Sequence, residues 1–129
     1  MIIGIGSDII EVSRVKKVAT DKFLFKYFTE QEIELINNNA LRIAGNFACK
    51  EAVAKALGIG FAGISPRDIE ILRDQHGAPI VYLYNGALEQ FTKINGAKLF
   101  ATISHCAEYA TATVVIESLM LYSAHQTVQ

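Results

Sequence analysis

The chain has 129 residues, of which 51% are hydrophobic, and its formal net charge is −1. This length fits one domain that buries about two-thirds of its unfolded surface, and an isoelectric point near 6.3 disfavours nucleic-acid binding. Its two cysteines cannot build a disulfide framework and lack zinc-finger spacing. Without a recognisable secretory signal or a run of about 18 apolar residues, we expect a cytoplasmic protein. Its high apolar content predicts self-association.

The first expected element is a strand over residues 1–11, in which Asp8 stands among branched aliphatic side chains. A buried, unpaired carboxylate there would cost several kcal/mol. A divalent cation shared with Glu51 would offset that cost, because such cations bind carboxylate oxygens, water and phosphate.

The next segment, residues 13–27, is basic and has the pattern of a helix. Its charged residues are Arg14, Lys16, Lys17, Lys22 and Lys26, with Asp21 as the single acid. A solvated helix face is the usual interpretation of such a run. The alternative is a docking surface for an acidic protein.

Two helices follow. Thr29 and Glu32 have the spacing of a capping box, which predicts a helix that the asparagines at 37–39 break. A long helix is expected over residues 40–57, and it ends at Gly58.

The long helix combines a buried stripe with two charged residues. The stripe consists of small and apolar residues at three-and-four spacing: Leu41, Ala44, Ala48, Ala52 and Ala56. Glu51 and Lys55 lie one turn apart on a shared face. They are either an exposed ion pair worth about 0.3–0.5 kcal/mol or an acid and a base at the edge of a site.

Residues 58–63 match the dinucleotide fingerprint G-x-G-x-x-G. The fingerprint requires a strand before the glycines and a helix after them, whereas this loop follows a helix, so we reject a Rossmann site. The loop either stops the helix or lets the backbone approach a ligand.

The C-terminal half is rich in strands. Residues 69–72 and 79–84 predict a hairpin, and residues 99–104 and 109–116 finish an antiparallel sheet. Asn85 is expected to cap the helix between the two pairs. These elements predict an α+β fold, with the antiparallel sheet packed on the long helix.

Ser104 and His105 interrupt an apolar strand with polar, reactive side chains. A lone histidine on such a strand is more often a satisfied core residue than a catalytic one. We divide the chain into a domain over residues 1–118 and a tail over residues 119–129, whose apolar start either packs on a neighbouring subunit or frays.

Three blocks of sequence stand out together. They are Gly4-Ile5-Gly6-Ser7-Asp8-Ile9-Ile10-Glu11, Ala44-Gly45-Asn46-Phe47-Ala48-Cys49-Lys50-Glu51-Ala52 with Lys55-Ala56-Leu57-Gly58, and Ile103-Ser104-His105 followed by Tyr109-Ala110. In content and order they resemble the signature blocks of holo-acyl-carrier-protein synthase, the short bacterial type of 4′-phosphopantetheinyl transferase. The resemblance covers nearly the whole chain, from Met1 to about Glu117.

The resemblance implies a 4′-phosphopantetheinyl transferase fold in a single domain, assembled as a homotrimer with a site at each subunit interface. It implies transfer of 4′-phosphopantetheine from coenzyme A to a serine hydroxyl of apo acyl carrier protein in fatty acid biosynthesis. It also implies that adenosine 3′,5′-bisphosphate is released. Such phosphoryl transfer needs a metal, a cation near the pyrophosphate and a proton acceptor.

By resemblance, Asp8 and Glu51 hold Mg²⁺ with water and a phosphate oxygen of coenzyme A, and Lys55 contacts the pyrophosphate. Lys50 is expected to reach another phosphate. The proton acceptor stays open among Glu51, Asp8, a metal-held water and His105. The expected lining of the coenzyme A cleft also includes Gly58, Gly60, Ser104 and His105.

The resemblance also assigns the basic segment. Positions matching Arg14, Lys22 and Lys26 dock the acidic carrier protein in that family, which favours docking here. Asn46 stands where the family commonly has an arginine, so a contact of that arginine is missing or supplied elsewhere. Cys49 replaces a usual alanine, and we interpret it as a packing residue.

Two competing hypotheses remain from the residues. One is a metal-dependent pyrophosphate hydrolase that uses Asp8 and Glu51 with water in place of the carrier serine. The other is a non-catalytic oligomeric module that binds acidic proteins through its basic helix.

Overall fold

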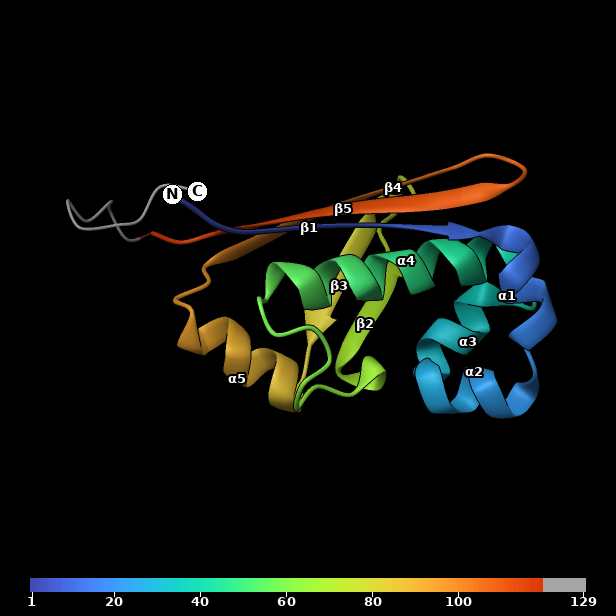
Figure 1. Cartoon of the computed structure of the whole chain (residues 1–129), viewed down its shortest axis with the longest axis horizontal. Helices are drawn as coiled ribbons and strands as arrows, with labels where there is room; N and C mark the ends of the chain where they lie inside the picture. The colour runs from blue at the N-terminus through green and yellow to red at the C-terminus, as the bar shows by residue number, and fades with distance from the viewer. Residues whose placement is uncertain (120–129) are drawn as a thin grey trace.

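The computed structural model describes residues 1–119, with one long helix at the centre of the molecule (Figure 1). In chain order the elements are β1 (Ile2–Glu11), α1 (Val12–Val18), α2 (Asp21–Tyr27), α3 (Glu30–Ile36), α4 (Ala40–Ala56), the 3-10 turn η1 (Pro66–Asp68), β2 (Ile69–Arg73), β3 (Pro79–Leu83), α5 (Asn85–Lys93), β4 (Lys98–His105) and β5 (Tyr109–Glu117). The predicted α+β class is confirmed.

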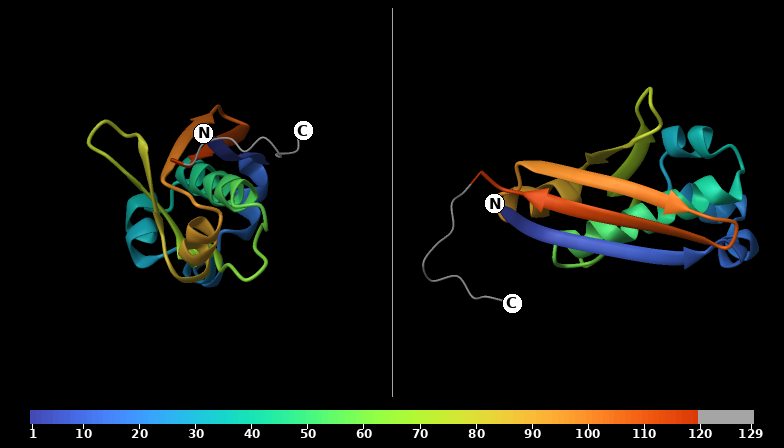
Figure 2. Two further views of the ribbon diagram at one scale, coloured as in Figure 1. Left: turned by 90° about the vertical axis from the view of Figure 1, so that its left-hand side faces the viewer. Right: turned by 90° about the horizontal axis from the view of Figure 1, so that it is seen from above.

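Within residues 1–119 the strands form two antiparallel sheets, one ordered β1-β5-β4 and the other the β2-β3 hairpin. The predicted hairpin is therefore separate from the sheet that packs on α4, and Figure 2 shows it standing to one side. In the larger sheet Asp8 pairs with Ala112, which pairs in turn with Ile103 of β4. Strand β5 thus separates β1 from β4.

Glycines let β1 lie directly on the backbone of α4. A Cβ atom at Gly4 would overlap the carbonyl oxygen of Ala56, and one at Gly6 would overlap that of Ala52. Because side chains alternate along a strand, Asp8 faces the same way as these two glycines. The close approach therefore brings Asp8 to the surface of α4.

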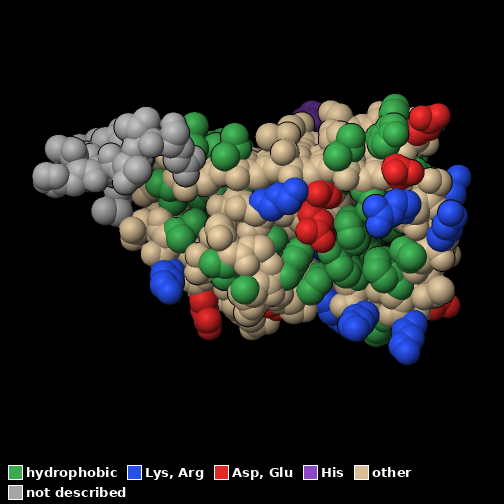
Figure 3. Space-filling view, viewed as in Figure 1, with side chains coloured by type: hydrophobic (Ala, Val, Ile, Leu, Met, Phe, Trp, Pro, Cys, Tyr) green, Lys and Arg blue, Asp and Glu red, His purple; other side chains and the backbone are tan. Residues whose placement is uncertain are grey.

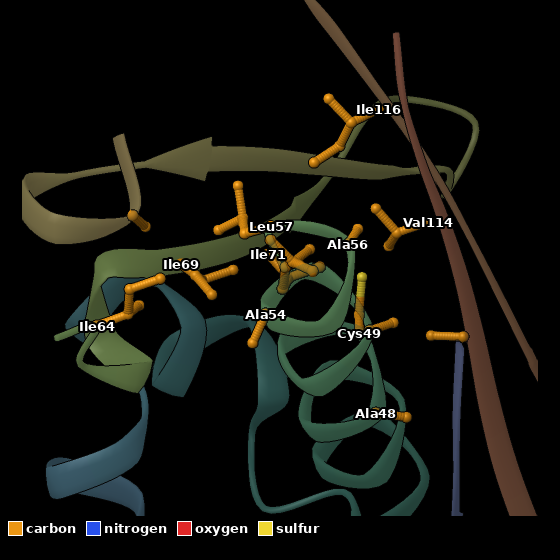
Figure 4. Close-up of a cluster of buried hydrophobic side chains, with 14 residues drawn as sticks. Ala48, Cys49, Ala54, Ala56, Leu57, Ile64, Ile69, Ile71, Val114 and Ile116 are labelled. Atoms are coloured by element: carbon orange, nitrogen blue, oxygen red, sulfur yellow. The ribbon is translucent and has the colours of Figure 1, made fainter. Parts of the chain in front are cut away.

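The core lies between α4 and the larger sheet. Ala48, Ala52 and Ala56 of α4 are buried, as the stripe predicted, and they pack in one cluster with Val114 and Ile116 of β5. Figure 4 shows Val114 and Ile116 pointing from the strand toward the helix. Small side chains on the helix leave room for branched ones on the strand.

The basic segment departs from the single predicted helix. It forms α1 and α2 instead, because the hydroxyl of Thr20 accepts a hydrogen bond from the backbone N–H of Phe23 (3.2 Å) and starts a new helix. The predicted capping box at Thr29 and Glu32 is confirmed.

The predicted cap at Asn85 is wrong. Tyr84 is the N-cap of α5, and Asn85 is the first helical residue with a φ of 47°. The amide of Asn85 donates instead to Asp68 (3.1 Å), so it ties α5 to η1. The predicted tail lies outside the described residues from position 120 onward.

The outer face of the larger sheet carries exposed apolar side chains. Ile5 and Ile9 of β1 are 69% and 63% exposed, and Phe100 of β4 is 51% exposed. Each of these residues alternates with neighbours that face α4. In the described part of the chain, no helix has the length and apolar character needed to cross a membrane.

Candidate active site

Asp8 and Lys55 meet where β1 crosses α4. The ammonium of Lys55 donates to the carbonyl oxygen of Ser7 (2.8 Å) and lies 3.3 Å from Oδ1 of Asp8. The Lys55 side chain is 53% exposed, so solvent screening limits this ion pair to less than about 1 kcal/mol. The contact places an exposed cation beside a carboxylate.

Glu51 lies one turn before Lys55 and binds an aromatic hydroxyl. The phenol of Tyr27, at the end of α2, donates to Oε1 of Glu51 (3.0 Å). Burial raises the pKa of Tyr27, and the charge and hydrogen bond of Glu51 and the charge of Asp8 raise that pKa further. Both carboxylates therefore act on one phenol, which stays protonated at neutral pH.

The donor set fits a hard divalent cation. Asp8 and Glu51 are carboxylates on adjoining elements, and their hydrogen bonds within residues 1–119 use one oxygen each. Residues 1–119 contain no group of three or more acidic, histidine or cysteine side chains placed to hold a metal. A Mg²⁺ ion here would need water and substrate phosphate for its remaining positions, as Mg²⁺ sites usually do.

Acidic and basic side chains alternate over this site. Figure 3 shows acidic side chains between basic ones over β1 and α4, with apolar side chains beside them toward the N-terminal helices. This surface combines carboxylates, ammonium groups and exposed apolar side chains.

Lys50, which the sequence predicts to reach a phosphate, is buried away from the surface. Its ammonium is fully buried and lies 2.7 Å from Oε1 of Glu32, which is also fully buried. It also donates to the carbonyl oxygens of Pro66 and Ile69. Lys50 therefore joins α4 to α3 and β2 and does not face the site of its neighbour Glu51.

Ser104 and His105 lie apart from the two carboxylates within one chain. They stand at the end of β4, and their cross-strand partners in β5 are Thr111 and Ala110. Neighbouring strands are about 5 Å apart, so β5 separates β4 from Asp8 by about 10 Å. Ser104 and His105 also point to opposite faces of the sheet, because side chains alternate.

The glycine loop follows directly after the end of α4, which carries Lys55 in its last turn. Gly58 and Gly60 have φ values of 88° and 56°, which favour glycine, and the loop follows α4 as predicted. Phe61 of this loop lies 6.4 Å from Tyr27 between ring centres. The loop therefore borders the neighbourhood of Glu51.

Arg14 of α1 and Lys22 and Lys26 of α2 are exposed, as a docking role requires. Apolar side chains accompany them, because Val18 is 50% exposed and Phe25 59% exposed. The N-terminal helices thus present a mixed basic and apolar surface.

Sequence reasoning missed Tyr27 and Arg73. Asn46 is buried, donates to Glu32 and to the carbonyl oxygen of Ile71, and accepts a hydrogen bond from Nη2 of Arg73 (2.7 Å). A guanidinium from β2 therefore contacts Asn46. No spacing in the sequence links positions 46 and 73, so the contact of Arg73 could not be predicted. Tyr27 could have been singled out, because it carries the only hydroxyl in the aromatic run 23–28.

Comparison with known proteins identifies the family to which this fold and site belong. The family model described as the 4′-phosphopantetheinyl transferase superfamily matches residues 4–114. The chain belongs to that superfamily. A holo-[acyl-carrier-protein] synthase of Clostridium novyi is 48% identical over 122 residues, which cover 91% of this chain and 88% of the relative. The chain therefore groups with the holo-acyl-carrier-protein synthases, which are transferases.

Solved structures agree with this assignment. The holo-[acyl-carrier-protein] synthase of Helicobacter pylori in complex with coenzyme A is 37% identical, with a TM-score of 0.79 over 88% of this chain and 99% of that one. The Bacillus anthracis enzyme in complex with CoA (3′,5′-ADP) is also 37% identical, with a TM-score of 0.77 over 92% and 98%.

Proposed function

We propose that the site around Asp8, Glu51 and Lys55 transfers 4′-phosphopantetheine from coenzyme A to a serine hydroxyl of apo acyl carrier protein. The serine oxygen forms a bond to the β-phosphorus of coenzyme A, and the bond from that phosphorus to the bridging oxygen breaks. Adenosine 3′,5′-bisphosphate leaves, and the serine proton passes to a base. The observation that carries the proposal is the meeting of an acid, a second acid and a lysine where β1 crosses α4.

Asp8 and Glu51 would hold Mg²⁺ in this site. When bound, Mg²⁺ neutralises charge on phosphate oxygens and orients the pyrophosphate. The second oxygen of each carboxylate has no hydrogen bond within residues 1–119, which supports this assignment because hard cations favour carboxylate ligands.

Lys55 orients the pyrophosphate and offsets charge on the leaving group. Its exposed ammonium is tied to Ser7 and Asp8 by contacts that a phosphate oxygen can replace. Asp8, Glu51 and His105 remain the side-chain candidates for the proton acceptor. Tyr27 is not among these candidates, because its hydroxyl is the donor in the hydrogen bond to Glu51.

A homotrimer with sites between subunits would complete the cleft. The apolar outer face around Ile5, Ile9 and Phe100 supports burial against another copy of the chain. Ser104 and His105 lie across the sheet from Asp8, so a neighbouring subunit is the better source of these two groups. Gly58 and Gly60 would let the loop approach coenzyme A from the same chain.

The carrier protein would dock on α1 and α2. Arg14, Lys22 and Lys26 are exposed there, and acyl carrier proteins present acidic surfaces. Electrostatic complementarity of this kind speeds association and selects the partner. We place the reaction in the cytoplasm, where carrier protein and coenzyme A meet.

Mass spectrometry of apo carrier protein incubated with coenzyme A and Mg²⁺ tests the proposal. We expect a gain of one phosphopantetheine, lost in folded Asp8→Ala and Glu51→Ala variants and kept in Glu89→Ala, which removes an exposed acid of α5. Release of adenosine bisphosphate without a carrier would indicate a hydrolase instead. Carrier binding that is independent of Mg²⁺, with no mass change, would indicate a binding module.

A further inference from the structure

The ring of Tyr27 is packed between two other aromatic rings. Its ring stacks on Phe23 with centroids 5.4 Å apart and an interplanar angle of 16°, and on Phe47 at 4.9 Å and 15°. Phe23 belongs to α2 and Phe47 to α4. The phenyl ring is therefore fixed from both sides by apolar contacts.

This stack points the hydroxyl of Tyr27 at Glu51. The hydroxyl donates to Oε1 at 3.0 Å, and Glu51 is the acid that the proposed function assigns to the metal. One oxygen of the carboxylate is thereby fixed, which leaves Oε2 for a ligand. A hydrogen bond to a charged acceptor is among the stronger ones in proteins.

We propose that Tyr27 is a positioning residue that orients the Glu51 carboxylate for the divalent cation. The inference rests on the proposed function, because it assumes that Glu51 is a metal ligand. Groups behind the ligands of a metal set their orientation, and their loss typically weakens metal affinity by roughly 10- to 100-fold.

Tyr27 also links the candidate metal site to the basic helix α2. Tyr27 is the last residue of α2, the helix that also carries Lys22 and Lys26. The helix assigned to the carrier thus also holds the hydroxyl that orients Glu51. A structural role alone would be met by a phenylalanine in the same stack.

Tyr27→Phe tests the inference, because it keeps the ring stack and removes the hydroxyl. The matched control is Tyr84→Phe, which removes a phenol that donates to Oε1 of Glu70 (3.1 Å) away from the site. Calorimetric titration of Mg²⁺ into each protein with coenzyme A bound measures metal affinity directly. Thermal unfolding of the metal-free proteins measures folding separately.

We expect Tyr27→Phe to weaken Mg²⁺ binding by roughly tenfold and to raise the half-saturating Mg²⁺ in the transfer assay equally. The KM for the carrier at saturating Mg²⁺ should not change, and Tyr84→Phe should match the wild type. Unchanged Mg²⁺ affinity in Tyr27→Phe would overturn the inference. If Glu51→Ala loses Mg²⁺ binding while Tyr27→Phe keeps it, the inference about Tyr27 is wrong and the proposed function still holds.

A double-mutant cycle covers the case in which Tyr27→Phe is destabilised. Glu51→Asp shortens the carboxylate so that it no longer reaches the phenol, and Tyr27→Phe in that background should then change Mg²⁺ affinity little. If Tyr27→Phe weakens Mg²⁺ affinity by the same factor in the wild type and in Glu51→Asp, the inference is overturned. If wild type and Glu51→Ala bind Mg²⁺ equally, the proposed metal site itself is wrong.

Discussion

Glu32 and Lys50 form an ion pair in which neither side chain has exposed surface. Burial raises the pKa of Glu32 and lowers the pKa of Lys50, so each charge depends on its partner. Lys50→Met should therefore lower the free energy of unfolding by about 3–5 kcal/mol, because it leaves a buried carboxylate without its cation. Urea denaturation measures this, and Lys55→Met, which removes an exposed pair, should cost below about 1 kcal/mol. Equal losses in both variants would contradict the assignment of Lys50.

Cys49 is a packing residue, as the sequence predicted, and its thiol is sealed in the core. Burial raises the pKa of Cys49 from 9.0 to about 12. In a Cys106→Ala variant, a thiol reagent at pH 8 should label nothing until urea unfolds the chain. The unfolded thiol ionises first as pH rises, so the free energy of unfolding should also fall above about pH 9. Rapid labelling of the folded variant would contradict this.

The packing of β1 on α4 depends on how closely the two backbones approach each other. Gly6→Ala should destabilise the protein by about 1–3 kcal/mol, because its Cβ would overlap the backbone of Ala52 and push the strand away. The same shift would move Asp8 from Glu51 and weaken Mg²⁺ binding. Ser7→Ala, on the outward face of the same strand, is the control for unfolding and metal titrations. Wild-type Mg²⁺ affinity in Gly6→Ala would contradict this role for the contact.

Most elements could be predicted because their signals are local. The capping box at Thr29 and the alanine stripe of α4 depend on spacing within a few turns. Lys50 could not be placed in that way, since its burial depends on Glu32 of another helix. The resemblance named Asp8, Glu51 and Lys55, but the hydrogen bond of Tyr27 to Glu51 joins residues 24 positions apart, and only the tertiary packing reveals it.

At the scale of the whole molecule, Asp8 and His105 of one chain lie on strands that β5 separates. If a site takes its acids from one subunit and His105 from another, Asp8→Ala and His105→Ala subunits refolded together should regain activity. Random pairing at equal amounts would restore about one quarter of the sites. Each variant refolded alone should stay inactive, and sedimentation should give a trimer. Trimers that stay inactive after mixing would contradict sites shared between subunits.

The most direct test of the account is a crystal grown with coenzyme A and Mn²⁺, which binds the ligands that Mg²⁺ prefers and gives an anomalous signal. We predict a metal peak within about 2.3 Å of carboxylate oxygens from both Asp8 and Glu51, and beside a phosphate oxygen of coenzyme A. A bound coenzyme A whose metal lies away from either acid would contradict the central claim.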